Sequence, residues 1–459
     1  MIKIKISLCI IFCCVMQVNL FALNFNTYIS NPNNSFIKVN DKDAATSHTE
    51  TQLFYFGNTS KNKKGILINN ALNYDAATGY GFDFNSASNV KMNSNTFSTA
   101  KPTYFSVKLP EGNYQIEVGM GSTEKQSNIT IKAESRRLML NQLSIKKGKT
   151  ATKIFNVNVR TPRINDSLNV SLKDREKDIL NWDDKLTLEF LGDVNIQSIK
   201  ITPKDNLTVV YLAGDSTVTD QDVEPWASWG QFITNYFDEN VVVANYAVSG
   251  SALSSFKGGN RLKKILSLIK KGDYLFVEFG HNDEKIKGEG NGAWGSYSTL
   301  LAEFVQSAKD KGAIPVLVTP TQRRSFNENG TLNETHGEFP AAMRAVAQKN
   351  NVALIDITKM TTELYEAWGD EPSRKAFVQY PANTFPGQEK ALEDNTHFNS
   401  FGANEIALCV VKGIRELDIP LKRQIQKEVP NYNPKKPNYF SDWTLPMSDR
   451  YEITKPDGN

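Results

Sequence analysis

The feature that most constrains the fold is a change in hydrophobic pattern after residue 205. The run at 207–214 is continuously apolar, as expected for a parallel strand that is covered on both faces. More strands are expected at 241–245, 274–279, 314–319 and 352–356. Helices are expected at 226–237, 261–269, 300–311, 341–348 and 403–414. This alternation predicts an α/β fold with a five-stranded parallel sheet, whose ligands bind at the carboxyl ends of the strands.

The region before residue 205 carries strand signals with little helical periodicity. Apolar residues alternate with polar ones at 105–109 and again at 114–120, and the turn signal 110–113 lies between them, which predicts a β-hairpin. Further short strands are expected at 127–134, 153–160, 185–192 and 197–203. We therefore predict a β-sandwich domain over 23–205, an α/β domain over 206–420 and an extended tail over 421–459.

The first 22 residues have the pattern of a secretory signal peptide. Lys3 and Lys5 precede an apolar run that is too short for a membrane span, and a small residue, Ala22, ends the segment. The mature protein is therefore expected to be secreted or periplasmic, without a membrane anchor. It would retain a single cysteine, Cys409, in an apolar run that is typical of core packing.

Charge and histidine content exclude several kinds of partner. The chain has 53 Lys and Arg against 50 Asp and Glu, whereas nucleic-acid binding needs concentrated positive charge. The four histidines form no HxH or HExxH cluster, so no metal site is expected. No cofactor is expected either.

Four polar clusters follow predicted strands or precede the last helix. They contain the residue types that acyl transfer needs: a hydroxyl nucleophile, a base with an orienting carboxylate, and donors aimed at an oxyanion. A tight turn would allow one segment to supply both the base and the carboxylate. Each cluster taken alone is equally a turn or cap signal. The clusters are Gly214-Asp215-Ser216, the 245–250 segment that ends in Gly250, Gly280-His281-Asn282-Asp283, and Asp394-Asn395-Thr396-His397.

Together and in this order, the clusters resemble the four blocks of the SGNH (GDSL-like) hydrolases, over about 207–414. The resemblance implies a flavodoxin-like three-layer α/β/α domain. It also implies a catalytic triad of Ser216, Asp394 and His397. The implied oxyanion donors are the backbone N–H groups of Ser216 and Gly250 and the side chain of Asn282.

Several longer stretches, among them VEFGHND, TPTQRRSF and DNTHFNSFGANEIA, look like rhamnogalacturonan acetylesterases. The upstream strands resemble the β-domain, of galactose-binding-like type, that precedes some bacterial members. This resemblance implies an acetylated polysaccharide or oligosaccharide substrate. One departure is Ser251, which stands where the family often has arginine.

Contacts with the substrate are candidates at three positions. Arg323 and Arg324 follow a predicted strand and could form charge-assisted hydrogen bonds with uronate carboxylates. The alternative is that both arginines are exposed to solvent in a loop and bind nothing. His281 either touches substrate or supports its loop. The alternatives to a pectic esterase are an esterase of xylan or another acylated glycan, an esterase of lipid, and an inactive carbohydrate-binding protein.

Overall fold

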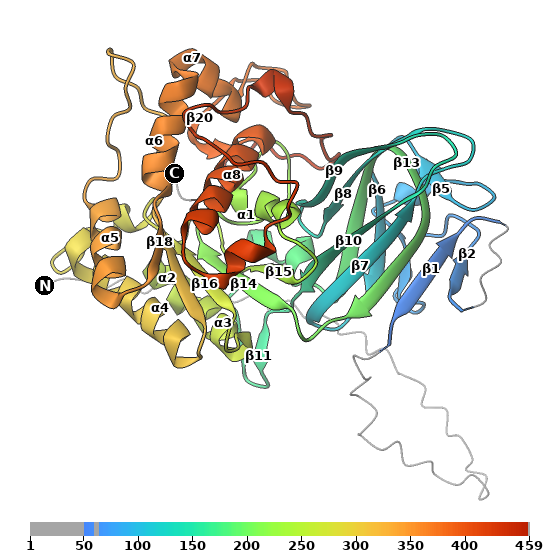
Figure 1. Ribbon diagram of the computed structural model, residues 1–459, viewed down its shortest axis with the longest axis horizontal. Helices are drawn as coiled ribbons and strands as arrows, with labels where there is room; N and C mark the ends of the chain where they lie inside the picture. Colours follow the sequence, from blue (N-terminus) through green and yellow to red (C-terminus); the bar gives the residue numbers. More distant parts are fainter. Residues whose placement is uncertain (1–49, 59–63, 458–459) are drawn as a thin grey trace, which may run out of the picture. The chain divides into compact units, whose positions relative to one another are not determined.

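The structure is a computed structural model that describes residues 50–58 and 64–457. The predicted signal peptide, 1–22, therefore lies outside the described residues. Two regions of different architecture follow one another along the described chain, first all-β and then α/β (Figure 1). No helix in the described part of the chain is long and apolar enough to cross a membrane.

The N-terminal region is a β-sandwich, as its alternating pattern predicts. Its strands form two sheets that share one long strand, β13 (Lys185–Pro203). The second half of β13 pairs with β1 (Gln52–Phe56), β5 (Phe97–Thr99) and β7 (Gly112–Met120), and these reach β2 (Ile66–Ile68), β4 (Lys91–Met92) and β10 (Ala151–Val159). The first half pairs with β6 (Thr103–Lys108) and β8 (Ser127–Ala133), and these reach β3 (Tyr80–Asp83) and β9 (Arg137–Ile145).

Aromatic side chains from both sheets meet in the core of the sandwich. Phe54 and Phe56 of β1 lie edge-to-face against Phe105 of β6, each with ring centroids 5.4 Å apart. All three rings are fully buried, and such edge-to-face pairs add to the stabilisation that burial of their area provides. A small antiparallel pair, β11 (Arg163–Asn165) and β12 (Leu168–Asn169), stands apart from the two sheets.

The predicted hairpin between 105–109 and 114–120 is wrong. Both strands form, but β6 pairs with the first half of β13 and β7 pairs with its second half, so the chain crosses from one sheet to the other between them. The two strands expected at 185–192 and 197–203 are likewise one strand. Alternation of apolar and polar residues indicates which face of a strand is buried, but it does not indicate which strand lies beside it. Strands of both sheets of a sandwich have the same alternating pattern, so the pattern cannot distinguish the true partners.

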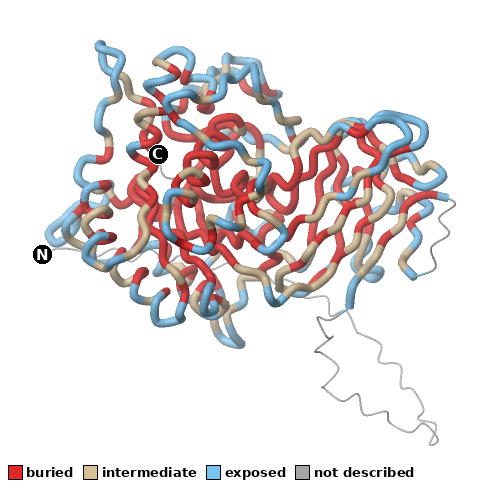
Figure 2. The backbone as a smooth tube through the Cα atoms, viewed as in Figure 1, coloured by how far each residue is buried: buried red, intermediate tan, exposed pale blue. Residues whose placement is uncertain are grey.

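The C-terminal region contains the predicted five-stranded parallel sheet. Its order is β15-β14-β16-β17-β18, which places the first strand between the second and the third. The five strands lie within about two residues of the expected ranges and are largely buried (Figure 2). They are β14 (Thr208–Gly214), β15 (Val241–Asn245), β16 (Tyr274–Glu278), β17 (Ile314–Val318) and β18 (Ala353–Ile355).

Helices cover both faces of this sheet, so the region has the expected three layers. One face packs against α1 (Trp229–Phe232), α6 (Ile357–Trp368) and α8 (Ser400–Glu416). The other packs against α2 (Leu253–Gly258), α3 (Arg261–Leu268), α4 (Ser298–Asp310) and α5 (Phe339–Asn350). The helix predicted at 226–237 is shorter than expected, because α1 gives way to a 3-10 turn, Ile233–Tyr236. The sequence analysis missed α6. Cys409 of α8 is fully buried in the core.

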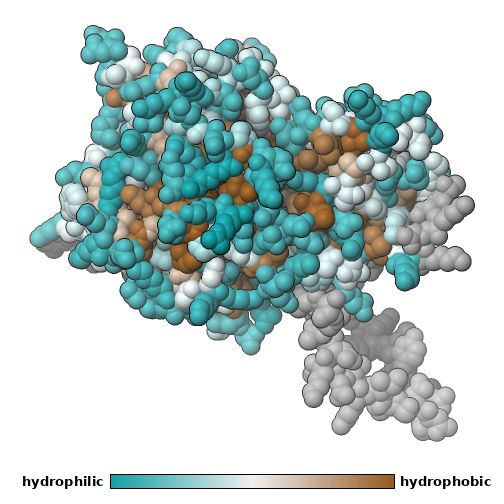
Figure 3. Space-filling view, viewed as in Figure 1, coloured by the Kyte–Doolittle hydropathy of each residue, from teal (hydrophilic) through white to brown (hydrophobic). Residues whose placement is uncertain are grey.

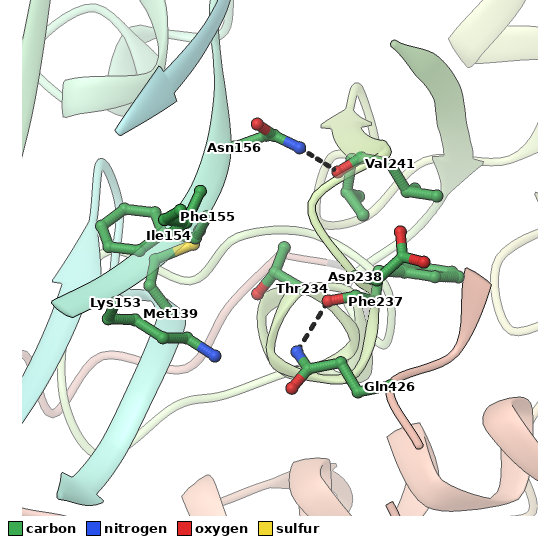
Figure 4. A pocket seen from close by; sticks show the side chains of 11 residues that line it. Met139, Lys153, Ile154, Phe155, Asn156, Thr234, Phe237, Asp238, Val241 and Gln426 are labelled. Atoms are coloured by element: carbon green, nitrogen blue, oxygen red, sulfur yellow. Dashed lines mark hydrogen bonds between the residues drawn. The ribbon is translucent and has the colours of Figure 1, made fainter. Parts of the chain in front are cut away.

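The segments around the last helix are partly irregular. A short helix α7 (Asp370–Ser373) leads into an antiparallel pair, β19 (Phe377–Tyr380) and β20 (Leu392–Phe398), just before α8. After α8 the chain contains 3-10 turns at Pro420–Gln424 and Phe440–Asp442. Gln426 of this segment donates to the carbonyl of Phe237, and close by Asn156 of β10, in the sandwich, donates to the carbonyl of Val241 in β15 (Figure 4).

Candidate active site

Ser216 lies directly beyond the carboxyl end of β14. Strands β15 and β16 flank β14 on its two sides, so their connections diverge there and leave a crevice, which is where open α/β sheets bind ligands. The Ser216 side chain is 4% exposed. The segments that follow β15 and β16 carry Gly250 and Asn282, so three of the four predicted clusters converge at one edge of the sheet.

Ser216, His397 and Asp394 form a continuous hydrogen-bonded chain. Nε2 of His397 lies 2.8 Å from Oγ of Ser216, and Nδ1 lies 2.9 Å from Oδ2 of Asp394. With Nδ1 protonated and donating to the carboxylate, Nε2 is free to accept the serine proton. The three side chains come from positions up to 181 residues apart in sequence and have the geometry of a nucleophile, a base and an orienting group.

The Asp394–His397 segment lies in strand β20 (Leu392–Phe398), whereas the sequence predicts a tight turn. Its local shape is nevertheless turn-like, because Oδ1 of Asp394 accepts the backbone N–H groups of Thr396 (2.7 Å) and His397 (2.8 Å). Burial alone would raise the pKa of Asp394. The hydrogen bonds and charge of His397 outweigh this, so the pKa lies well below its ordinary value and the carboxylate stays ionised.

Buried polar side chains form hydrogen bonds around the segment that carries Ser216. Oδ1 of Asp215 accepts the N–H of Thr217, and the Thr217 hydroxyl lies between Oδ1 of Asp215 (2.9 Å) and Oε1 of Glu278 (3.0 Å). Burial, helped by the charge of Asp215, raises the pKa of Glu278 to about 8. Gln221 and Ser228 donate to the Ser216 carbonyl at 3.0 and 2.6 Å. These bonds fix the backbone on both sides of the nucleophile, and the sequence analysis identified none of them.

The N-terminal region also contributes side chains to this loop. Arg137 of β9 donates to Asp220 at 2.7 Å, and Arg136 donates to the carbonyl of Trp226 at 2.7 Å and pairs with Glu224. Both arginines are more than nine-tenths buried. The ring of Trp226 stands edge-to-face to His397 with centroids 5.7 Å apart. The sandwich therefore helps to hold the segment that packs against the candidate base.

Gly250 and Asn282 lie in the segments that follow the two neighbours of β14, strands β15 and β16. Gly250 has φ of +74°, a conformation that glycine adopts without strain. The amide Nδ2 of Asn282 lies 3.2 Å from the carbonyl oxygen of Ser251, which joins the two loops. The Ser251 hydroxyl faces Ser255 at 3.2 Å, so it packs within its own loop.

His281 is 1% exposed and is therefore buried in the protein interior. Its Nδ1 is 3.6 Å from Asp215, and its ring stands against that of His336 with centroids 4.6 Å apart. Burial, together with His336, lowers the pKa of His281 to about 4, so the ring is neutral near pH 7. This environment is that of a side chain that supports its loop. Substrate contact by His281 stays a prediction.

Arg323 and Arg324 both have carboxylate partners within the protein. Arg323 pairs with Glu284, which also accepts from Nδ1 of His336 at 2.9 Å. Arg324 is 6% exposed, pairs with Asp370 and donates to Ser373 and Asn395. The contacts of Arg324 join α7 to β20, the strand that carries Asp394 and His397. A role of either arginine in substrate binding stays a prediction.

The end of the chain reaches the candidate triad. Trp226 donates its indole N–H to the carbonyl of Glu452 at 2.8 Å. Nζ of Lys455 lies 3.3 Å from Oδ2 of Asp394, the oxygen that faces His397. Nothing in the tail's composition indicated these contacts. Among residues 50–58 and 64–457, no group of three or more His, Cys, Asp or Glu is arranged to hold a metal ion.

Comparison with known proteins identifies relatives that match the α/β region. The profile of the GDSL-like Lipase/Acylhydrolase family matches residues 212–403. The rhamnogalacturonan acetylesterase RhgT of Bacillus subtilis (strain 168) is 45% identical over 215 residues, which are 46% of this chain and 92% of that protein. The same strain's probable rhamnogalacturonan acetylesterase YesY is 36% identical over 222 residues, 48% of this chain and 98% of that one.

A further relative also extends into the sandwich region. The uncharacterized esterase YxiM of the same strain is 25% identical over 384 residues, which cover 80% of this chain and 91% of that protein. The crystal structure of YxiM from Bacillus subtilis superposes with a TM-score of 0.43 at 23% identity, over 80% of this chain and 98% of that one.

Proposed function

Because the chain belongs to the GDSL-like lipase/acylhydrolase family and is a carboxylic ester hydrolase, we propose that it removes acetyl groups from rhamnogalacturonan, a pectic polysaccharide. The observation that carries the proposal is the hydrogen-bonded chain from Ser216 through His397 to Asp394. The substrate rests on the 45% identity to a rhamnogalacturonan acetylesterase that the chain covers almost entirely.

The proposed reaction proceeds through an acyl-enzyme. Nε2 of His397 takes the hydroxyl proton as Oγ of Ser216 attacks the acetyl carbonyl carbon. The N–H groups of Ser216 and Gly250 and the Asn282 amide donate to the oxyanion. His397 then gives its proton to the departing sugar oxygen, and the acetyl group remains on Ser216. Water, deprotonated by the same base, attacks the acetyl-serine, and acetate leaves as the serine is restored.

The proposal also covers where the protein acts and how its chain is divided into domains. Residues 1–22 would direct the chain out of the cytoplasm, where polysaccharide is met, and would then be removed. The mature enzyme would comprise the sandwich over 23–205, the catalytic domain over 206–420 and the tail over 421–459, and would need no metal ion or other cofactor. On the face seen in Figure 3 hydrophilic residues predominate, with apolar patches between them.

Acetate release from a panel of polymers tests the proposed substrate. Acetylated rhamnogalacturonan, acetylated homogalacturonan and acetylated xylan, matched in acetyl content, are incubated with the full chain. We expect the fastest release from rhamnogalacturonan, by at least about tenfold over xylan in kcat/KM, which corresponds to about 1.4 kcal/mol of differential transition-state binding. A preference for xylan would contradict the pectic assignment and leave an esterase of another glycan.

A further inference from the structure

Two cations from the N-terminal region lie beside the loop that carries Gly250. Nζ of Lys173 donates to the carbonyl of Ser249 at 2.6 Å, and Arg175 is two residues further along the same segment. Both side chains hold one carboxylate, that of Asp457: Lys173 at 3.1 Å and Arg175 at 3.4 Å. Partial burial raises the pKa of Asp457, but the hydrogen bond and charge of Lys173 and the charge of Arg175 outweigh it, so the pKa is lowered.

The tail that carries Asp457 also contacts residues of the candidate active site. Its Glu452 carbonyl binds Trp226, and its Lys455 ion-pairs with Asp394 on the histidine side of the nucleophile. Asp457 follows two residues later, and its partner Lys173 donates to the carbonyl of Ser249. Gln221 links this site to the nucleophile, because its Nε2 lies 3.0 Å from the Ser216 carbonyl oxygen and 3.3 Å from Oγ of Ser249, the residue whose carbonyl Lys173 contacts. The carboxylate site of Lys173 and Arg175 is therefore next to the segment that supports Ser216.

The three partners are exposed enough to exchange. The side chains of Lys173, Arg175 and Asp457 are 38%, 37% and 48% exposed, and ion pairs in such settings stabilise a fold by no more than about 1 kcal/mol. A second carboxylate can therefore replace that of Asp457. By contrast, Arg261 and Glu176 form a neighbouring pair that is more than nine-tenths buried and serves the fold.

A small cavity next to Arg175 is also lined by Arg160, whose Nη2 lies 3.9 Å from Oδ2 of Asp220. Arg175, Ser249, Gln221 and Arg160 are among the residues that line it. Arg160 is 2% exposed, and within the described residues its Nε and Nη1 have no hydrogen-bond partner. Its guanidinium lies 4.7 Å from the ring centroid of Trp182. Because Asp220 balances its charge, Arg160 offers a ligand the two free N–H donors and not an unpaired charge, which suits oxygen acceptors.

We propose that Lys173 and Arg175 form a subsite for a carboxylate of the substrate, and that Asp457 occupies this subsite when no substrate is bound. The ligand class is a uronate residue near the acetylated sugar. The subsite rests on the proposed function, and it gives the N-terminal region a part in recognising the acidic polymer. It differs from Arg323 and Arg324, whose charges are balanced by Glu284 and Asp370.

The test compares Arg175→Gln and Asp457→Asn with the full wild-type chain. On acetylated rhamnogalacturonan at low ionic strength, Arg175→Gln should raise KM about fivefold, because a charged partner of the uronate is lost. Asp457→Asn should lower KM about threefold, because the competing carboxylate is removed. Both effects should be smaller on neutral acetylated xylan and should shrink in salt. Lys177→Gln is the matched control: this exposed side chain of the same segment pairs with Asp174, and the KM should not change.

A binding measurement separates this proposal from the proposed function. Deacetylated galacturonate oligosaccharide is used as an inhibitor of aryl acetate hydrolysis. Its inhibition constant should rise with Arg175→Gln and fall with Asp457→Asn. If these shifts occur but wild type releases no acetate from rhamnogalacturonan, the subsite stands and the assigned polymer is wrong. If acetate is released and neither variant shifts the KM for the acidic polymer or the inhibition constant, the subsite is refuted.

Discussion

Replacing Ser216 with alanine is expected to lower kcat for an aryl acetate by at least about 10³-fold. The alanine has no oxygen to attack the ester, so the hydroxyl that lies 2.8 Å from Nε2 of His397 is lost. His397→Ala should cost a similar amount, since the members of such a chain act as a unit. The measurement is initial-rate kinetics on purified variants whose melting temperatures match that of wild type.

The matched control for this prediction is Ser254→Ala. Ser254 is an exposed serine of α2, so its replacement should leave the rate within twofold of wild type. A folded Ser216→Ala protein that keeps wild-type rates would show that another residue attacks the ester.

Asp394→Asn should lower kcat by about 10²- to 10⁴-fold with little change in fold. The asparagine Oδ1 can still accept the N–H groups of Thr396 and His397, so the turn is kept. Its Nδ2, however, donates where the carboxylate accepted. The imidazole must then carry its proton on Nε2, where it can no longer take the proton of Ser216, and the imidazolium loses its compensating charge.

The role of the Asp394 carboxylate is checked by comparing kcat of Asp394→Asn with that of a variant at an exposed neighbouring residue. Glu393→Gln, one residue earlier on β20, removes the same charge at an exposed position and should leave kcat nearly unchanged. An Asp394→Asn protein with wild-type kcat would mean that the carboxylate serves only the fold.

The parallel sheet was predictable because buried parallel strands carry an unbroken apolar signal. Each strand from β14 to β18 is covered on both faces, so its sequence contrasts with the amphipathic helices around it. Helix α6 was not predicted because polar residues interrupt its apolar pattern. Two of them, Thr358 and Thr361, are buried and donate their hydroxyls to backbone carbonyls instead of to solvent. Pairing in the sandwich was not predictable, since local alternation does not distinguish partners on a shared long strand.

The part of the candidate site that could be predicted consists of residues that directly follow the parallel strands. Ser216, Gly250 and Asn282 follow β14, β15 and β16, and parallel strands bring their carboxyl ends to the same edge. The supporting residues were not predictable. Arg137 acts on Asp220 across 83 positions, and Lys455 reaches Asp394 from the tail, through contacts that only the tertiary fold creates. Arg324 carried the right charge for a substrate contact, but a partner near in space, Asp370, balances it.

Active-site labelling tests the central claim most directly, that Ser216 is the nucleophile. The full chain is treated with an aryl alkylphosphonate, which transfers its phosphonyl group to an activated serine, and the digested protein is analysed by mass spectrometry. The account predicts one phosphonyl group per chain, on the peptide that contains Ser216, formed in step with loss of esterase activity and absent from His397→Ala. Complete inactivation with Ser216 unmodified, or with the label on another residue, would contradict it.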